Sequence, residues 1–172
     1  MCAGRTFVRM KYRRLTREEL EELRPQFVRF LAAQGIDADL WKKLKVTDEA
    51  RTATLLDQFS AMVYDDVLRR AEYLEERSDV QLFVYKCGPE KLELRGLLIR
   101  GEADGLDFRK EVPPGELVET LKRGKARVQV AQAERGYKPN REEDLFRLLE
   151  RGARIAKTGE LWGLLDGLTG EG

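Results

Sequence analysis

Histidine is absent from the 172 residues, and serine, asparagine and cysteine occur only two, one and two times. Catalytic triads that use histidine, general acid–base catalysis by imidazole and zinc sites with histidine ligands are therefore excluded. Cys2 and Cys87 are too few for a disulfide framework, so we interpret them as free thiols in a reducing cytosol. Cys87 follows a predicted strand, and we expect a half-buried structural thiol there rather than a nucleophile.

Long apolar runs are also missing. No stretch approaches the roughly 18 residues of a membrane span, and the basic start lacks the apolar segment of a signal peptide. There is no phosphate-binding loop, and the carboxylates between residues 65 and 76 alternate with arginines, so we expect no metal and no cofactor. The predicted location is the cytoplasm.

Charge is dense but balanced, with 32 basic and 31 acidic residues, and an apolar fraction of 42% suffices for a folded core. The pattern predicts a flexible basic arm over residues 1–14, a single domain over 15–168 and a flexible tail over 169–172. A second possible start at Met10 leaves open whether residues 1–9 belong to the native protein.

Helix signals fill the first half of the chain. Thr16 and Glu19 have the spacing of a capping box, and an apolar stripe follows them. Pro25 lies inside this stripe, so we expect a kink or a break near residues 21–23. Asp37 is expected to cap a short helix, and the longest helical pattern predicts one helix over residues 48–77.

The apolar period then changes to two. Residues 80–99 predict a β-hairpin, and further strands are predicted near 106–112 and 126–132. More helices are expected over residues 116–123, from Asn140 through Ala156, and around 161–168. Helices followed by strands and then helices indicate an α+β fold, with an antiparallel sheet of about four strands packed against N-terminal and C-terminal helices.

Two basic clusters are candidates for nucleic-acid binding, because cations attract phosphates and an aromatic ring can stack on a base. The competing interpretations are a solvated leader for the first cluster and a charged helix end for the second. The candidate residues are Lys11, Tyr12, Arg13, Arg14, Lys122, Arg123, Lys125 and Arg127.

Apolar side chains near the C-terminus are candidates for a protein interface. Leu161, Trp162 and Leu165 lie on a short helical pattern that must dock on something to be stable. The dock is either the chain's own core, which we favour, or a partner or second copy. Trp41 is a further interface candidate, since tryptophan is enriched at such anchors.

Four segments resemble a small bacterial family that carries only a domain-of-unknown-function label. They are KYRRLTREELEEL, QFVRFLAAQGIDADLW, RRAEYLEERS and PNREEDLFRLLERGARI. Members are about 160 residues long, the size of one domain, and start near the position of Met10. The resemblance spans the chain from Met10 to about Leu168 and implies a bacterial cytosolic protein. It assigns no activity and no catalytic residues.

The sequence therefore favours a non-catalytic cytosolic binding or adaptor protein whose partner is a protein or a second copy of itself. The alternative is an RNA- or DNA-binding protein that uses the two basic clusters. An enzyme built from carboxylates without histidine is the third and least favoured possibility, and no catalytic residue is assigned.

Overall fold

The computed structural model describes residues 11–170, and the chain separates into two compact units, residues 1–67 and 68–172. Each unit contains its own hydrophobic cluster. The single domain predicted over 15–168, and the packing of the N-terminal helices on the sheet, stay predictions.

The first unit is helical. Its helices are α1 (Arg17–Glu22), α2 (Arg24–Ala33), α3 (Ala38–Thr47) and α4 (Glu49–Arg70), which continues past the unit's last residue. Thr16 and Glu19 form the predicted capping box, and Asp37 caps α3 as predicted. The expected break falls at Leu23, and Pro25 occupies the first turn of α2. Backbone N–H groups in the first turn have no partner within the helix, so proline costs no hydrogen bond there.

Aromatic rings form the centre of this unit. Phe59 of α4 is fully buried, and its ring centroid lies 4.9 Å from that of Phe27 and 5.5 Å from that of Phe30. Trp41 of α3 is half-buried and meets Phe27 edge-on at 5.3 Å. The backbone N–H of Leu15 donates to Ser60 Oγ at 3.0 Å, which fixes the chain leading into α1.

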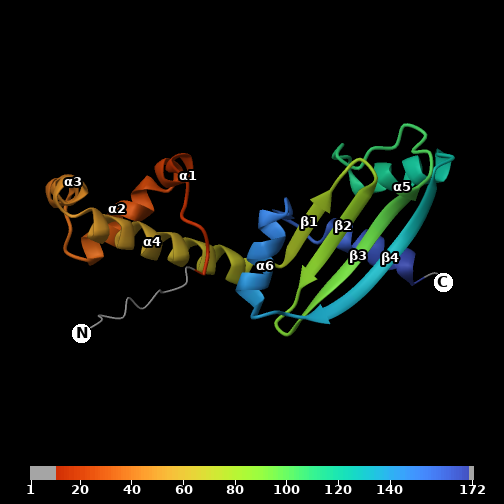
Figure 1. Ribbon diagram of the computed structural model, residues 1–172. Coiled ribbons are helices and arrows are strands. Elements are labelled where there is room, and N and C mark those ends of the chain that lie inside the picture. Colours follow the sequence, from red (N-terminus) through yellow and green to blue (C-terminus); the bar gives the residue numbers. More distant parts are fainter. Residues whose placement is uncertain (1–10, 171–172) are drawn as a thin grey trace. The chain divides into compact units, whose positions relative to one another are not determined.

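The second unit is built on a five-stranded antiparallel sheet in the order β4-β3-β2-β1-β5 (Figure 1). Its strands are β1 (Tyr73–Arg77), β2 (Gln81–Cys87), β3 (Lys91–Arg100), β4 (Arg127–Gly136) and β5 (Arg154–Ile155). Its helices are α5 (Pro114–Arg123), α6 (Arg141–Glu150) and α7 (Glu160–Thr169). The α+β class and the 80–99 hairpin are confirmed, with five strands instead of about four.

The two faces of the sheet differ. One face, which we name the α7 face, carries Leu82 and Leu97, and these pack with Leu165 of α7 in one buried cluster. In Figure 1 the blue C-terminal helix lies behind the strands. The other face, the α6 face, carries Phe83 and its cross-strand partner Gly96.

The helix predicted over residues 48–77 is too long, because α4 ends at Arg70 and residues 73–77 form β1. Leu74 is fully buried and continues the apolar spacing of the helix. For this reason the sequence pattern predicted a single helix where the structure has a helix followed by a strand. Pairing of β1 with both β2 and β5 satisfies its backbone on both sides, and this outweighs the helical pattern.

The strand predicted near 106–112 is wrong, because the structure has turns there. Asp104 and Gly105 adopt positive φ angles of 49° and 79°, and Leu106 N–H bonds back to the Ala103 carbonyl. The alternation arose because this loop buries Phe108 in the α7-face cluster.

The predicted helix from Asn140 ends earlier than expected. Asn140 caps α6, but Gly152 adopts a φ of +109°, and residues 154–155 pair with β1 instead. α7 runs through Thr169, the first residue of the predicted tail, and residues 171–172 lie outside the described part.

Candidate functional site

The cations of the predicted arm that the structure describes are all paired with carboxylates. The hydrogen bond to Asp65 raises the pKa of Lys11, and hydrogen bonds from Arg13 lower the pKa of Glu19 to about 2. The pairs are Lys11–Asp65 (2.8 Å), Arg13–Glu19 (2.8 Å) and Arg14–Asp57 (2.6 Å). Residues 1–10 of the predicted arm lie outside the described residues. Phosphate would have to compete with these acids for each cation.

Tyr12 lies in the core of the first unit. Its side chain is 4% exposed, and its hydroxyl donates to Asp65 Oδ1 at 2.5 Å. Burial, together with that bond, raises the pKa of Tyr12 to about 12. A ring in this position is not available to stack on a base, so the structure does not bring Tyr12 into a nucleic-acid surface.

The second basic cluster remains exposed. Lys122 and Arg123 end α5, as predicted for cations at a helix C-terminus, and Arg123 lies 3.6 Å from Glu119. Lys125 and Arg127 follow, both exposed. Within residues 11–170, no ion pair engages the side chains of Lys122, Lys125 or Arg127. Of the two clusters, this one keeps its charge available.

Three predicted interface residues lie in the core of the second unit. Leu161 and Trp162 are 7% and 8% exposed, and Leu165 is fully buried. The Trp162 ring lies 5.0 Å below the guanidinium of Arg95, which also bonds to Asp166 of α7 at 2.8 Å. Of the two docks considered for this segment, these three side chains occupy the chain's own core, because α7 covers the sheet.

Cys87 is a buried thiol. Burial raises its pKa to about 12, and the nearby Arg141 offsets only part of this rise. A thiol with so high a pKa is a poor nucleophile, as its sequence context predicts. The part of the chain that the structure describes contains no cluster of acidic or cysteine side chains able to hold a metal ion, and none of its helices has the length and apolarity to cross a membrane.

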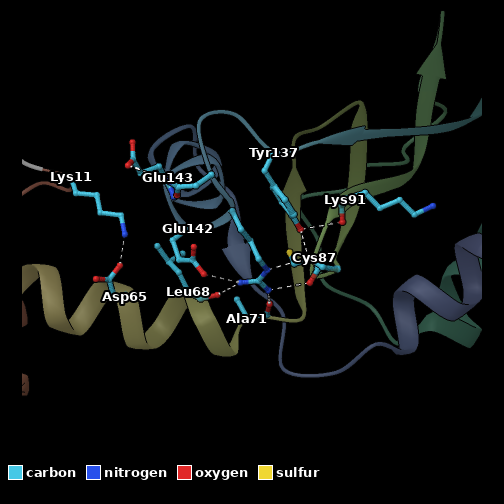
Figure 2. A network of polar contacts seen from close by, with 12 residues as sticks. Lys11, Asp65, Leu68, Ala71, Cys87, Lys91, Tyr137, Glu142 and Glu143 are labelled. Atoms are coloured by element: carbon cyan, nitrogen blue, oxygen red, sulfur yellow. Dashed lines mark hydrogen bonds and ion pairs between the residues drawn. The ribbon is translucent and has the colours of Figure 1, made fainter.

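Figure 2 shows a network of polar contacts that includes Leu68, Ala71 and Cys87, which the sequence did not predict. The Arg141 side chain is 16% exposed, and its guanidinium donates to four backbone carbonyls. The acceptors are Leu68 O (2.7 Å), Ala71 O (2.7 Å), Cys87 O (3.0 Å) and Gly88 O (3.1 Å). Arg141 thereby ties the last turn of α4 to the hairpin turn and to α6, and we assign it to the fold rather than to a site.

A groove of about 350 Å³ opens beside the starts of α5 and α7. Arg77 in its wall already donates to Glu75 (2.9 Å) and to the Phe108 carbonyl (3.3 Å). The polar residues lining it are Glu75, Arg77, Glu111, Thr158 and Glu160. The lining is therefore acidic around a guanidinium that has its own partners, and it presents no catalytic arrangement that we recognise.

One edge of the sheet is formed by β4. All ten residues of β4 pair with β3 on one side, in a register without a bulge. Among the described residues no strand pairs with the other side of β4. We name this unpaired side of β4 the free edge. Residues 128–133, with the sequence VQVAQA, carry no charge and no proline. Sequence analysis predicted this strand but not that its second side stays unpaired.

The α6 face beside this edge is partly uncovered. Arg151, which caps the end of α6, reaches Glu76 at 3.1 Å. Arg135 of β4 forms a two-pronged ion pair with Asp144 of α6, so α6 covers one end of the face. Phe83 and Leu98, further along, are only half-buried. Beside backbone groups that no described strand pairs, this face thus carries partly exposed apolar side chains.

Comparison with known protein families gives a match. Residues 10–170 match the model of a family described as a family of unknown function, DUF6495. No curated protein and no solved structure matches the chain. The match covers nearly the entire chain from the position at which the resemblance begins, and the protein belongs to this family of unknown function.

Proposed function

We propose that this protein binds other proteins without catalysing a reaction, by accepting an extended polypeptide strand on the free edge of β4. The observation that carries the proposal is a ten-residue strand in regular register whose central segment, residues 128–133, carries no charge. Soluble proteins commonly protect long sheet edges with lysine, proline or a bulge. Residues 128–133 have none of these, so the edge suits strand addition.

The neighbouring surface supports the same function. A strand added to β4 would place alternate side chains on the α6 face, beside Ala131 and Ala133, and on the α7 face, beside Val128 and Val130. Val130 is 41% exposed although it pairs with buried Leu97. The backbone supplies affinity and these apolar contacts supply specificity.

The test uses random peptides of about 12 residues displayed on phage and selected on the immobilised full-length chain. We expect enriched peptides to be extended and apolar at alternate positions, and to protect the amides of residues 128–133 from hydrogen exchange. Gln132→Lys/Ala133→Lys, which charges two exposed edge positions, should weaken binding by about tenfold or more, or about 1.4 kcal/mol.

The matched control is Ala33→Lys/Gln34→Lys, which makes the same chemical changes at exposed positions of the first unit. It should leave peptide binding unchanged. Selection that enriches no peptide, or peptides that bind the edge variant as well as the wild type, would overturn the proposal.

A second candidate function is nucleic-acid binding by Lys122, Lys125 and Arg127, supported by their exposure and lack of ion pairs within the described chain. If it holds, replacing these three by glutamine should abolish RNA or DNA affinity in a filter-binding assay, and wild-type affinity should fall as salt rises. Replacing Lys11, Arg13 and Arg14 should matter less, because acids neutralise them. Affinity that is insensitive to salt would contradict this function.

A further inference from the structure

Resting on the proposed function, we infer that the strand accepted by β4 is β4 of a second copy of this chain. The pair would be antiparallel, with Val130 of one copy opposite Val130 of the other. Two five-stranded sheets would then join into one continuous sheet about a two-fold axis.

Symmetry restricts the possible registers. Side chains directly opposite each other in an antiparallel pair lie on the same face, so a two-fold axis perpendicular to the sheet pairs odd with odd positions and even with even. The centre of the uncharged segment 128–133 therefore admits two registers, one centred on Val130 and the other on Ala131.

Charge separates these two registers. The register centred on Ala131 places Arg127 directly opposite Arg135, and like charges in that position are destabilising. The register centred on Val130 places Arg127 opposite Ala133 and Val128 opposite Gln132. It opposes no two like charges within β4, because Arg135 would face Lys125, which lies before the first residue of the strand.

The exposure of Val130 favours the same register. Val130 pairs with Leu97, which lies on the α7 face, and is itself 41% exposed. Two Val130 side chains facing each other would cover that apolar surface. A strand segment with net charge would repel its own copy, whereas VQVAQA needs no complementary charge from its partner. This self-compatibility is the reason for assigning the site to a second copy.

One strand pair buries less surface than a standard stable interface, so we expect a reversible dimer with a Kd on the order of 10 µM. Sedimentation equilibrium of the full chain should show this dimer. Gln132→Lys/Ala133→Lys should raise the Kd by about tenfold or more, because it places like charges along both copies of the edge. Ala33→Lys/Gln34→Lys should leave it unchanged. A chain that is monomeric at about 1 mM, or a dimer that the edge variant does not weaken, overturns the inference.

Cysteine cross-linking tests the register, in a background with Cys2→Ser. Val130→Cys should form a covalent dimer on mild oxidation, since opposed Cβ atoms lie about 4.5–5.5 Å apart. Val128→Cys should not, because its two copies would be roughly 13 Å apart along the strands. Cross-linking through Ala131→Cys instead of Val130→Cys would overturn the register. A monomeric chain that still binds extended peptides at β4 would refute self-pairing while leaving the proposed function standing.

Discussion

The ring of Phe83 lies across Gly96 on the neighbouring strand, so closely that a Cβ added to Gly96 would come within 2.3 Å of Phe83 Cδ1. The same Cβ would lie 3.0 Å from the Leu82 carbonyl oxygen. The glycine is therefore required by the ring that covers it.

Replacing Gly96 by alanine should destabilise the protein by about 1–2 kcal/mol, because the Phe83 ring must leave its position. Urea unfolding followed by circular dichroism would measure the loss. Adding Phe83→Leu to Gly96→Ala should recover part of it, since the smaller side chain leaves room for the new methyl group. Equal stability of Gly96→Ala and wild type would show that the ring moves without cost.

Removing the Arg141 side chain should destabilise the protein more than Gly96→Ala does. Arg141→Ala leaves four carbonyl acceptors without their donor, and we expect a loss of about 2–4 kcal/mol in the same urea assay. Arg141→Lys should recover only a fraction, because an ammonium cannot reproduce the planar array of donors. Arg69→Ala, at an exposed arginine in α4, is the control and should change stability by less than about 0.5 kcal/mol. A similar cost for both alanine variants would contradict the role of Arg141.

The Arg13–Glu19 pair should make stability depend on pH. Its hydrogen bonds lower the folded-state pKa of Glu19 to about 2, below the usual value of about 4.3 in an unfolded chain. The stabilisation is therefore fully present above the unfolded pKa and is lost as pH falls from about 4.5 toward 2. Both side chains are more than one-third exposed, so solvent screening limits the effect to less than about 1 kcal/mol.

The measurement compares wild type with Glu19→Gln in urea at pH 7 and at pH 3. Wild type should be the more stable at pH 7, and the difference should shrink at pH 3. Glu18→Gln, at the exposed neighbouring position, controls for removing a negative charge from the first turn of α1. A Glu19→Gln difference that stays constant over this range would show that the ion pair adds nothing.

Cys87 should resist thiol reagents in the folded protein, because it is 7% exposed and burial raises its pKa to about 12. In a Cys2→Ser variant, an aromatic disulfide reagent at pH 8 should label Cys87 only after denaturant is added. Rapid labelling of the folded variant would instead reveal local opening of the end of β2.

Local signals in the sequence predicted most of the elements. Thr16, Asp37 and Asn140 cap helices because each cap bonds to amides two or three positions away, a distance over which sequence spacing is decisive. The 80–99 hairpin was also predictable because its two strands are joined by a short turn and pair with each other. Residues 73–77 were missed because their pairing with β2 and β5 is a long-range contact, and Leu74 fits both a helical stripe and a buried strand.

The candidate surface was only partly predictable. Valine and alanine in residues 128–133 indicated a strand, but only the sheet order shows that one side of it is free. Lys11, Arg13 and Arg14 were predicted as candidates from their clustering, and their carboxylate partners lie up to 54 positions away. The carbonyls that Arg141 binds come from two segments distant in sequence, so residue spacing could not predict these hydrogen bonds.

The two tryptophans of the chain fall one in each unit, Trp41 among the aromatic rings of the first and Trp162 beneath Arg95 in the second. Their surroundings differ, since one ring meets Phe27 edge-on while a guanidinium lies over the other. Variants that keep a single tryptophan therefore give each unit its own fluorescence signal. Superimposable unfolding curves from the two variants would mean that the units melt as one cooperative body, and separated curves would assign a midpoint to each.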